Sequence, residues 1–121
     1  MSTAKSNPQR GEVWNINFDP SKGAEIKKIR PSVVVNENAI GKLPLRIIVP
    51  ITEWKEAFET YPWFVKIESD PNNGLSKTSG ADAFQVKSLS TTRFVKKLGT
   101  LTEAQIDDIA SAIALCVGTP V

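Results

Sequence analysis

Residues 11–35 read GEVWNINFDPSKGAEIKKIRPSVVV and hold two strand patterns separated by a basic loop. In 12–18, apolar side chains alternate with polar ones, a period of two that is typical of a strand with one solvent-facing side. In 32–36, three consecutive valines indicate a strand that is covered on both faces. The segment therefore predicts that the chain begins as a β protein, with a charged loop at the entry of its second strand.

Four further strand patterns follow along the chain, at 46–52, 63–68, 84–89 and 92–98. The last two are expected to form a hairpin around Ser90-Thr91. The segments 36–45 and 69–80 are rich in turn-forming residues and predict loops, and 54–60 could form a short helical turn. Pro50 has no backbone N–H to donate, so a bulge, a sheet edge or a strand end is expected there.

The C-terminal segment carries the clearest helix pattern. Thr102 and Gln105 match a capping box, in which each side chain bonds the backbone N–H of the other residue. From 106 to 117, apolar residues recur at helical spacing, and Gly118 ends the pattern. Five or six short strands and one terminal helix predict a mainly β fold, a small, bent antiparallel barrel with a helix packed across it. The order of elements fits an SH3-like and an OB-like barrel equally.

The composition is that of a single globular domain. Of the 121 residues, 40% are hydrophobic and 23% are charged, and we expect residues 1–9 to be a flexible lead-in to one domain at 10–121. Residues 1–10 lack the apolar core of an export signal, and no apolar run approaches a membrane span, so a cytoplasmic protein is expected. All 15 basic residues lie at or before Lys97, which suits a phosphate-bearing partner as well as ordinary solubility.

The chain contains no histidine and one cysteine, which excludes whole classes of mechanism. A Ser-His-Asp triad, a Cys-His pair, a His-ligated metal and a two-His ribonuclease all require the missing residue. There is also no glycine motif that would cradle ATP phosphates, and no paired Asp cluster for two metals. What remains is phosphoryl transfer without a metal or other cofactor, on a substrate that brings its own nucleophile, as RNA does with its 2′-OH.

The basic loop and a later strand end hold candidate residues for such chemistry. Arg30 directly precedes Pro31, whose ring favours an extended backbone at Arg30, so its planar guanidinium would project from a fixed position and grip a phosphate in two places. Glu25 is the nearby carboxylate. Thr52 ends a strand with a hydroxyl that could either cap the next turn or donate to a phosphate. Three lysines of the loop add positive charge for an anionic polymer: Lys22, Lys27 and Lys28.

Several motifs share their spacing with a known family. They are Arg10-Gly11-Glu12-Val13-Trp14, Gly23 with Glu25 and Arg30-Pro31, Val49-Pro50-Ile51-Thr52, the Gly74-Leu75 to Ser79 loop, and Gln85 with Lys87-Ser88. In these positions the chain resembles the endoribonuclease toxins of type II toxin–antitoxin systems, the MazF/PemK/Kid family, over nearly its whole length. Each motif is weak by itself, whereas their joint spacing is specific.

The resemblance implies an SH3-like barrel with a C-terminal helix, a homodimer, and sequence-specific cleavage of single-stranded RNA without a metal, neutralised by a cognate antitoxin. It carries the family's catalytic Arg and Thr over to Arg30 and Thr52, and its candidate loop Glu to Glu25. Ser79 and Gln85, together with the three loop lysines, are expected to contact RNA.

Two positions depart from the family. Some members have a His where this chain has Ala24, and some an Asp where it has Phe84, so a mechanism that needs either side chain is not expected here. Two other functions stay open from the sequence, a non-catalytic module that binds RNA or protein through the same barrel, and a gyrase-poisoning toxin of related fold. Neither needs a phosphate clamp at Glu25, Arg30 and Thr52, which favours the endoribonuclease.

Overall fold

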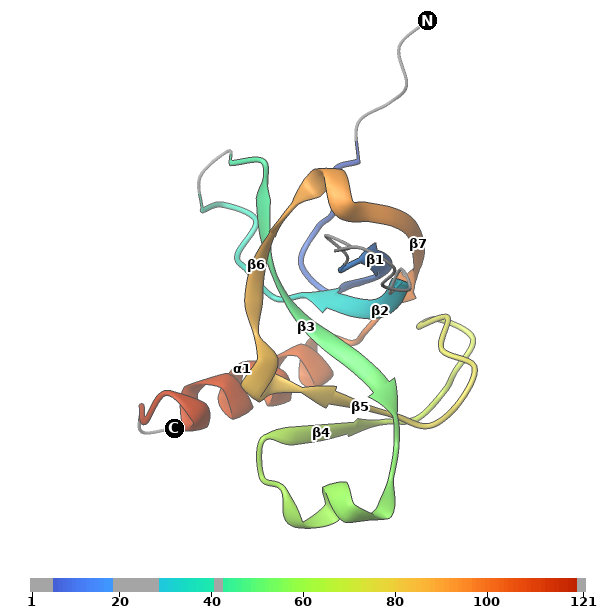
Figure 1. Cartoon of the computed structure of the whole chain (residues 1–121), viewed down its shortest axis with the longest axis vertical. Coiled ribbons are helices and arrows are strands. Elements are labelled where there is room, and N and C mark those ends of the chain that lie inside the picture. Colours follow the sequence, from blue (N-terminus) through green and yellow to red (C-terminus); the bar gives the residue numbers. More distant parts are fainter. Residues whose placement is uncertain (1–5, 19–28, 41–42, 120–121) are drawn as a thin grey trace, which may run out of the picture.

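The computed structural model describes residues 6–18, 29–40 and 43–119, which form strands, short 3-10 helices (η) and one α-helix (Figure 1). In chain order the elements are β1 (Glu12–Asn17), β2 (Ile29–Val34), β3 (Leu45–Glu53), η1 (Glu56–Thr60), β4 (Phe64–Ile67), β5 (Ser79–Asp82), η2 (Ala83–Gln85), β6 (Lys87–Ser90), η3 (Thr91–Arg93), β7 (Phe94–Thr100) and α1 (Glu103–Cys116). All strand pairs among them are antiparallel. The predicted mainly β fold with a C-terminal helix is confirmed.

The strands make one bent sheet in the order β4-β5-β3-β2-β1-β7, with β6 paired to β3 beside this path. In Figure 1, β1, β2 and β7 curl into an upper lobe, while β4 and β5 extend into a lower one. Among the described residues the end strands β4 and β7 do not pair, so the sheet is barrel-like without being closed. No helix of the described ranges has the length and apolarity needed to cross a membrane.

Pro50 lies where β3 changes partners. Earlier residues of β3 pair with β6 and β2, and Pro50 itself stands opposite Ser32. Residues 51–53 then pair with β5. A residue without a backbone N–H is tolerated where the hydrogen-bonding ladder is interrupted. The expected interruption at Pro50 is therefore a change of partner within one continuous strand, which carries the end of β3 into the lower lobe (Figure 1).

The core explains the run of valines in β2. Val33 is fully buried in a cluster that includes Ile106 and Ile109 of α1. Val34, also fully buried, belongs to a second cluster with Ile16 and Phe94. Successive side chains of a strand point to opposite faces, so both faces of β2 are covered, as the sequence predicts.

The predicted helix forms with the expected start. In the capping box, the Gln105 backbone N–H donates to Thr102 Oγ1 at 3.1 Å, and the Thr102 N–H donates to Gln105 Oε1 at 2.8 Å. Ile106, Ile109 and Ala112 form the buried face. The α-helix ends at Cys116, and Gly118 follows with a positive φ of 78°, the backbone conformation that glycine adopts most readily after a helix.

Two expectations about the strands are wrong. The segment 84–89 is expected to be one strand, but its first residues form η2 and only Lys87–Ser90 make β6. The hairpin around Ser90-Thr91 is absent, because β6 pairs with β3 and β7 pairs with β1. The predicted loop 69–80 also ends earlier than expected, since Ser79 and Gly80 begin β5 between β3 and β4.

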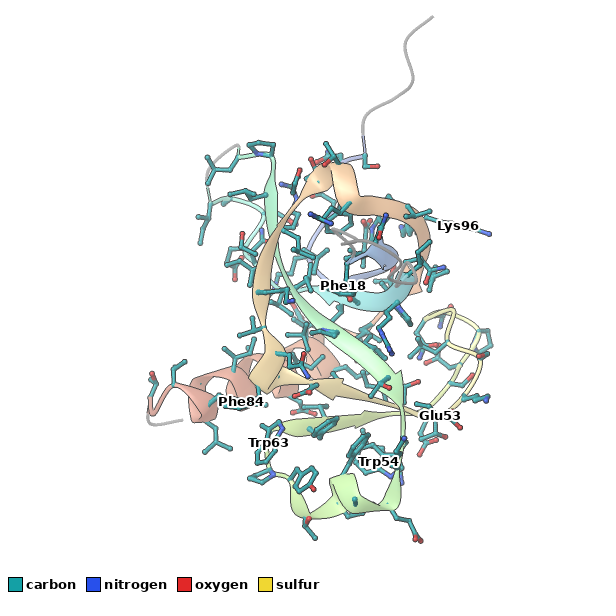
Figure 2. The ribbon with its side chains drawn as sticks, viewed as in Figure 1. Phe18, Glu53, Trp54, Trp63, Phe84 and Lys96 are labelled. Carbon is teal, nitrogen blue, oxygen red and sulfur yellow. The ribbon has the colours of Figure 1, made fainter. Side chains whose placement is uncertain are left out.

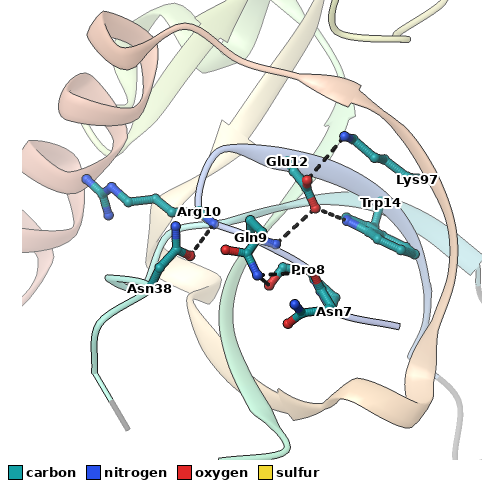
Figure 3. Close-up of polar contacts among 8 residues, drawn as sticks. All are labelled: Asn7, Pro8, Gln9, Arg10, Glu12, Trp14, Asn38 and Lys97. Atoms are coloured by element: carbon teal, nitrogen blue, oxygen red, sulfur yellow. Dashed lines mark hydrogen bonds and ion pairs between the residues drawn. The ribbon is translucent and has the colours of Figure 1, made fainter. Parts of the chain in front are cut away.

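A polar cluster around Glu12 joins the N-terminal residues to β1 and β7 (Figure 3). The Glu12 carboxylate accepts hydrogen bonds from the Gln9 backbone N–H and from Trp14 Nε1, each at 2.9 Å, and pairs with Lys97 Nζ at 3.1 Å. Burial by itself raises the pKa of Glu12, but these three partners outweigh it, so the pKa is lowered. Glu12 of the R-G-E-V-W motif therefore has a structural role, because it joins the residues before β1 to β7.

Candidate active site

Arg30 stands at the start of β2, exposed and next to Pro31. β2 pairs with β3 as far as Ser32 opposite Pro50, and Thr52 lies two residues beyond Pro50 in β3. Arg30 and Thr52 line the same two hollows, described next. The two residues for which the sequence predicts a catalytic role therefore border the same space.

Two open hollows meet at Arg30 and Thr52. The larger, called here the central cleft, has a volume of about 740 Å³ and is lined by β1, β2, the end of β3, β7 and the connection from β4 to β5. The smaller, called here the aromatic pocket, has a volume of about 440 Å³. Both are lined by Arg30 and Thr52. The aromatic pocket is completed by Pro50, Ile51, Phe58, Phe64, Asp82 and Gln85.

The other predicted site residues are divided between the two hollows. Ser79 lines the central cleft, where its hydroxyl donates to the Lys77 carbonyl at 2.8 Å. Gln85 lines the aromatic pocket, where its Nε2 donates to Asp82 Oδ2 at 3.1 Å. The predicted base Glu25 and the three loop lysines, Lys22, Lys27 and Lys28, lie outside the described residues.

The connection between β4 and β5 forms one wall of the central cleft (Figure 1, yellow). Asn73, within this connection, is fully buried, and its side-chain amide donates to the Glu68 carbonyl at 2.9 Å. Gly74 approaches β7 so closely that a Cβ there would lie 2.2 Å from the Leu98 carbonyl oxygen. Only glycine permits this contact, which fixes the wall against the sheet.

Charged groups that the sequence does not single out stand at the mouth of the cleft. Glu53 follows Thr52 at the end of β3 (Figure 2), and its carboxylate pairs with Lys77 Nζ at 3.6 Å. Both side chains are mostly exposed and line the central cleft. The pairing depends on how the 69–78 connection folds back onto β3, and no spacing in the sequence signals it.

An aromatic cluster surrounds the smaller pocket. Phe58 of η1 stacks on Phe64 of β4 with ring centroids 3.9 Å apart, and Trp54 meets both rings edge-on. Figure 2 shows Trp54 on the side of β4 that faces η1. The structure places Phe58 and Phe64 beside Arg30 and Thr52 rather than in the main core.

Phe84, at the position where the family resemblance implies an Asp in some members, is not among the residues that line either hollow. Its side chain is 65% exposed and lies near Trp63 (Figure 2), with ring centroids 5.9 Å apart. Asp82, two residues earlier, lines the aromatic pocket instead. A carboxylate thus stands near Arg30, although not at the family's position.

Comparison with known proteins shows which family the chain belongs to. The model of the PemK-like, MazF-like toxins of type II toxin–antitoxin systems matches residues 9–117. The chain belongs to this family. Among curated relatives of the family, endoribonuclease MazF9 of Mycobacterium tuberculosis is 29% identical over 113 residues, covering 88% of this chain and 93% of the relative. The endoribonuclease toxin MazF of Escherichia coli K12 is also 29% identical over 113 residues, covering 92% and 95%.

Solved structures of PemK/MazF-like toxins share the fold. A mycobacterial endoribonuclease in complex with its cognate antitoxin has a TM-score of 0.75 at 22% identity, covering 95% of this chain and 99% of that one. A MazE–MazF complex of Deinococcus radiodurans has a TM-score of 0.74 at 22% identity, covering 93% and 97%. At this level of identity the likeness concerns the fold, which agrees with the barrel and helix described above.

Proposed function

We propose that this PemK/MazF-like toxin is an endoribonuclease that cleaves single-stranded RNA at short sequences, without a metal or other cofactor. The observation that carries the proposal is the meeting of Arg30 and Thr52 between two open hollows of the barrel. Relatives that align with most of the chain are named endoribonucleases. The shared lining of both hollows by Arg30 and Thr52 supports a role for the two side chains at one phosphate.

In the proposed reaction, the 2′ oxygen attacks the adjacent phosphorus and the bond from phosphorus to the 5′ oxygen breaks. The products are a 2′,3′-cyclic phosphate and a 5′-hydroxyl. Negative charge grows on the phosphate oxygens in the transition state, where fixed donors have their largest effect. Arg30 supplies two parallel N–H donors, and Thr52 supplies a hydroxyl. Because the pKa of an arginine stays above about 12, Arg30 is suited to hold charge rather than to transfer a proton.

The 2′-OH must lose a proton and the leaving 5′ oxygen must gain one. We assign the first role, as base or orienting group, to Glu25, the carboxylate of the loop that enters β2, and water in the open cleft can supply the second proton. Lys22, Lys27 and Lys28 of the same loop would attract RNA without regard to sequence, so binding should weaken steeply with salt. Ser79 and Gln85 would contact RNA from the two hollows.

The proposed partners follow from the same site. Toxin structures with this fold include complexes with a cognate antitoxin, and we propose that an antitoxin neutralises this chain by covering the central cleft. We also propose a homodimer as the active form and the cytoplasm, where mRNA is translated, as the place of action. No membrane partner is proposed.

The test is incubation of the purified chain with a long single-stranded RNA in EDTA, followed by mapping of the fragment ends. Discrete cuts with cyclic phosphate and 5′-hydroxyl ends would support the proposal and reveal the recognition sequence. RNA that is bound but left intact would favour the non-catalytic module, and DNA breaks with intact RNA would favour a gyrase-poisoning toxin.

A further inference from the structure

We propose that the aromatic pocket is a subsite for one nucleobase beside the cleaved phosphate, and that Asp82 and Gln85 select a base that carries an exocyclic amino group. The inference rests on the proposed RNA cleavage and deepens it. It assigns the selection of one base in the recognition sequence to Asp82 and Gln85. Neither residue belongs to the predicted phosphate clamp.

The wall of the pocket is a prearranged stack of rings. Phe58 and Phe64 lie nearly parallel, at 15° and 3.9 Å, and Trp54 braces both from the edge at 5.5 and 6.5 Å. Gly80 makes this packing possible, since a Cβ there would come within 3.0 Å of ring atoms of Phe64 and Trp54. None of the residues of η1, which carries Phe58, is buried, so this aromatic surface borders solvent. Aromatic platforms of this kind bind bases of single-stranded nucleic acids by stacking.

The polar side of the pocket presents hydrogen-bond acceptors. The Asp82 carboxylate accepts from the Phe84 backbone N–H at 3.2 Å and from Gln85 Nε2 at 3.1 Å. A carboxylate can only accept, so Gln85 must turn its NH₂ toward Asp82, which leaves the amide oxygen as the group it offers elsewhere. Each carboxylate oxygen keeps a further acceptor site. The pocket therefore suits a base edge that donates.

The four bases differ in this respect. Adenine and cytosine have an exocyclic amino group as donor, and guanine has one beside a ring N–H. Uracil has no amino group and donates only through its ring N3–H, which stands between two carbonyl oxygens that a carboxylate repels. Stacking alone accepts every base, because every base has an aromatic face. Discrimination against uracil would therefore come from Asp82 and Gln85, while Phe58 and Phe64 would supply affinity.

The position of the pocket limits the base it would hold to one of the two that adjoin the cut phosphate. Arg30 and Thr52 line both the aromatic pocket and the central cleft. A phosphate between these two side chains would have its two neighbouring nucleotides directed into the two hollows. The pocket volume of about 440 Å³ lies within the range of pockets that enclose small ligands. The base in the pocket is thus next to the cleaved bond.

The test uses a pool of random-sequence RNA, cut by the full chain and by the Asp82→Asn variant, with the bases around each cut counted. Asn keeps an oxygen that can accept from the Phe84 N–H, so η2 stays capped, but it introduces donors. We expect wild type to disfavour uracil at one position adjoining the cut, and Asp82→Asn to raise the uracil share there about tenfold. Glu56→Gln, which removes an exposed carboxylate of η1 outside the pocket, is the matched control and should leave the base counts unchanged.

Unchanged base counts in Asp82→Asn would overturn the subsite while leaving RNA cleavage standing. A second measurement covers the case in which wild type makes no cuts. Quenching of tryptophan fluorescence by AMP, CMP, GMP and UMP should show weaker binding of UMP to wild type, and this difference should vanish in Asp82→Asn. If UMP binds wild type more weakly and no RNA is cleaved, the subsite is retained and the proposed function is rejected. Equal binding of all four nucleotides to wild type would reject the subsite.

Discussion

At the residue scale, Arg30 is the side chain on which the proposed chemistry depends most. It is exposed, so Arg30→Ala removes the phosphate donors without opening a cavity. We predict that the cleavage rate falls by roughly 10²–10³-fold or more, with a free energy of unfolding within about 0.5 kcal/mol of wild type. Single-turnover cleavage and urea unfolding measure the two quantities. Lys96→Ala, which removes an exposed positive charge of β7 away from both hollows, is the control, and equal rates for both variants would refute the role of Arg30.

Two substitutions at Thr52 distinguish the effect of its hydroxyl group from the effect of its side-chain shape. Thr52→Val keeps the branched side chain that the end of β3 accommodates, whereas Thr52→Ser keeps the donor. Loss of one hydrogen bond to a charged group has a cost of about 1.5–3 kcal/mol, so we predict cleavage at least about tenfold slower for the Val variant and near wild type for the Ser variant. Cleavage rates of both variants, measured at saturating RNA concentration, test this prediction. A Val variant as active as wild type would leave Thr52 with a structural role only.

At the element scale, Glu12 ties β1 to β7 and makes the fold sensitive to acid. Its folded-state pKa is lowered because the partners that bond its carboxylate outweigh burial, so its stabilisation is present above the unfolded value of about 4.3 and is lost as pH falls through the folded value. We predict that wild type is more stable than Glu12→Gln near neutral pH and that the difference shrinks below about pH 4. Urea unfolding at several pH values measures it, with exposed Glu37→Gln as control. A constant difference across pH would contradict the assignment.

The wall of the central cleft depends on a close contact between β7 and the β4–β5 connection. A Cβ at Gly99 would lie 2.3 Å from the Asn72 carbonyl oxygen, so Gly99→Ala must push the connection away from the sheet. We predict a loss of about 2–3 kcal/mol in the free energy of unfolding and slower cleavage, because Gly74 and Lys77 of this wall line the cleft. Gly118→Ala, which has a positive φ but no neighbour within 4 Å, should lose stability without slower cleavage. Full activity in Gly99→Ala would show that cleavage does not depend on the position of this wall.

At the scale of the whole molecule, the features that the sequence predicts are those set by near neighbours. The capping box of α1 and the covered strand at Val33 and Val34 are of this kind. β5 escapes prediction because Ser79–Asp82 lacks apolar alternation and is a strand only through its partners β3 and β4. The pairing of β6 with β3 is likewise a long-range choice.

The candidate site shows the same contrast between features set by near neighbours and features set by long-range packing. Family spacing points to Arg30 and Thr52, and the structure places both on the two hollows. The aromatic pocket could not be predicted, since it joins η1, β4 and the end of β5 through tertiary packing. Asp82 in particular has no local signal beyond being a carboxylate near a strand.

The most direct test of the central claim is a short RNA containing the cut sequence, compared with the same strand carrying a single 2′-deoxynucleotide on the 5′ side of the cut. If the 2′-OH is the nucleophile, the chain in EDTA cuts the all-ribose strand to a 2′,3′-cyclic phosphate and leaves the substituted strand intact while still binding it. Cleavage of the substituted strand at the same bond, with a 5′-phosphate on the product, would contradict the account.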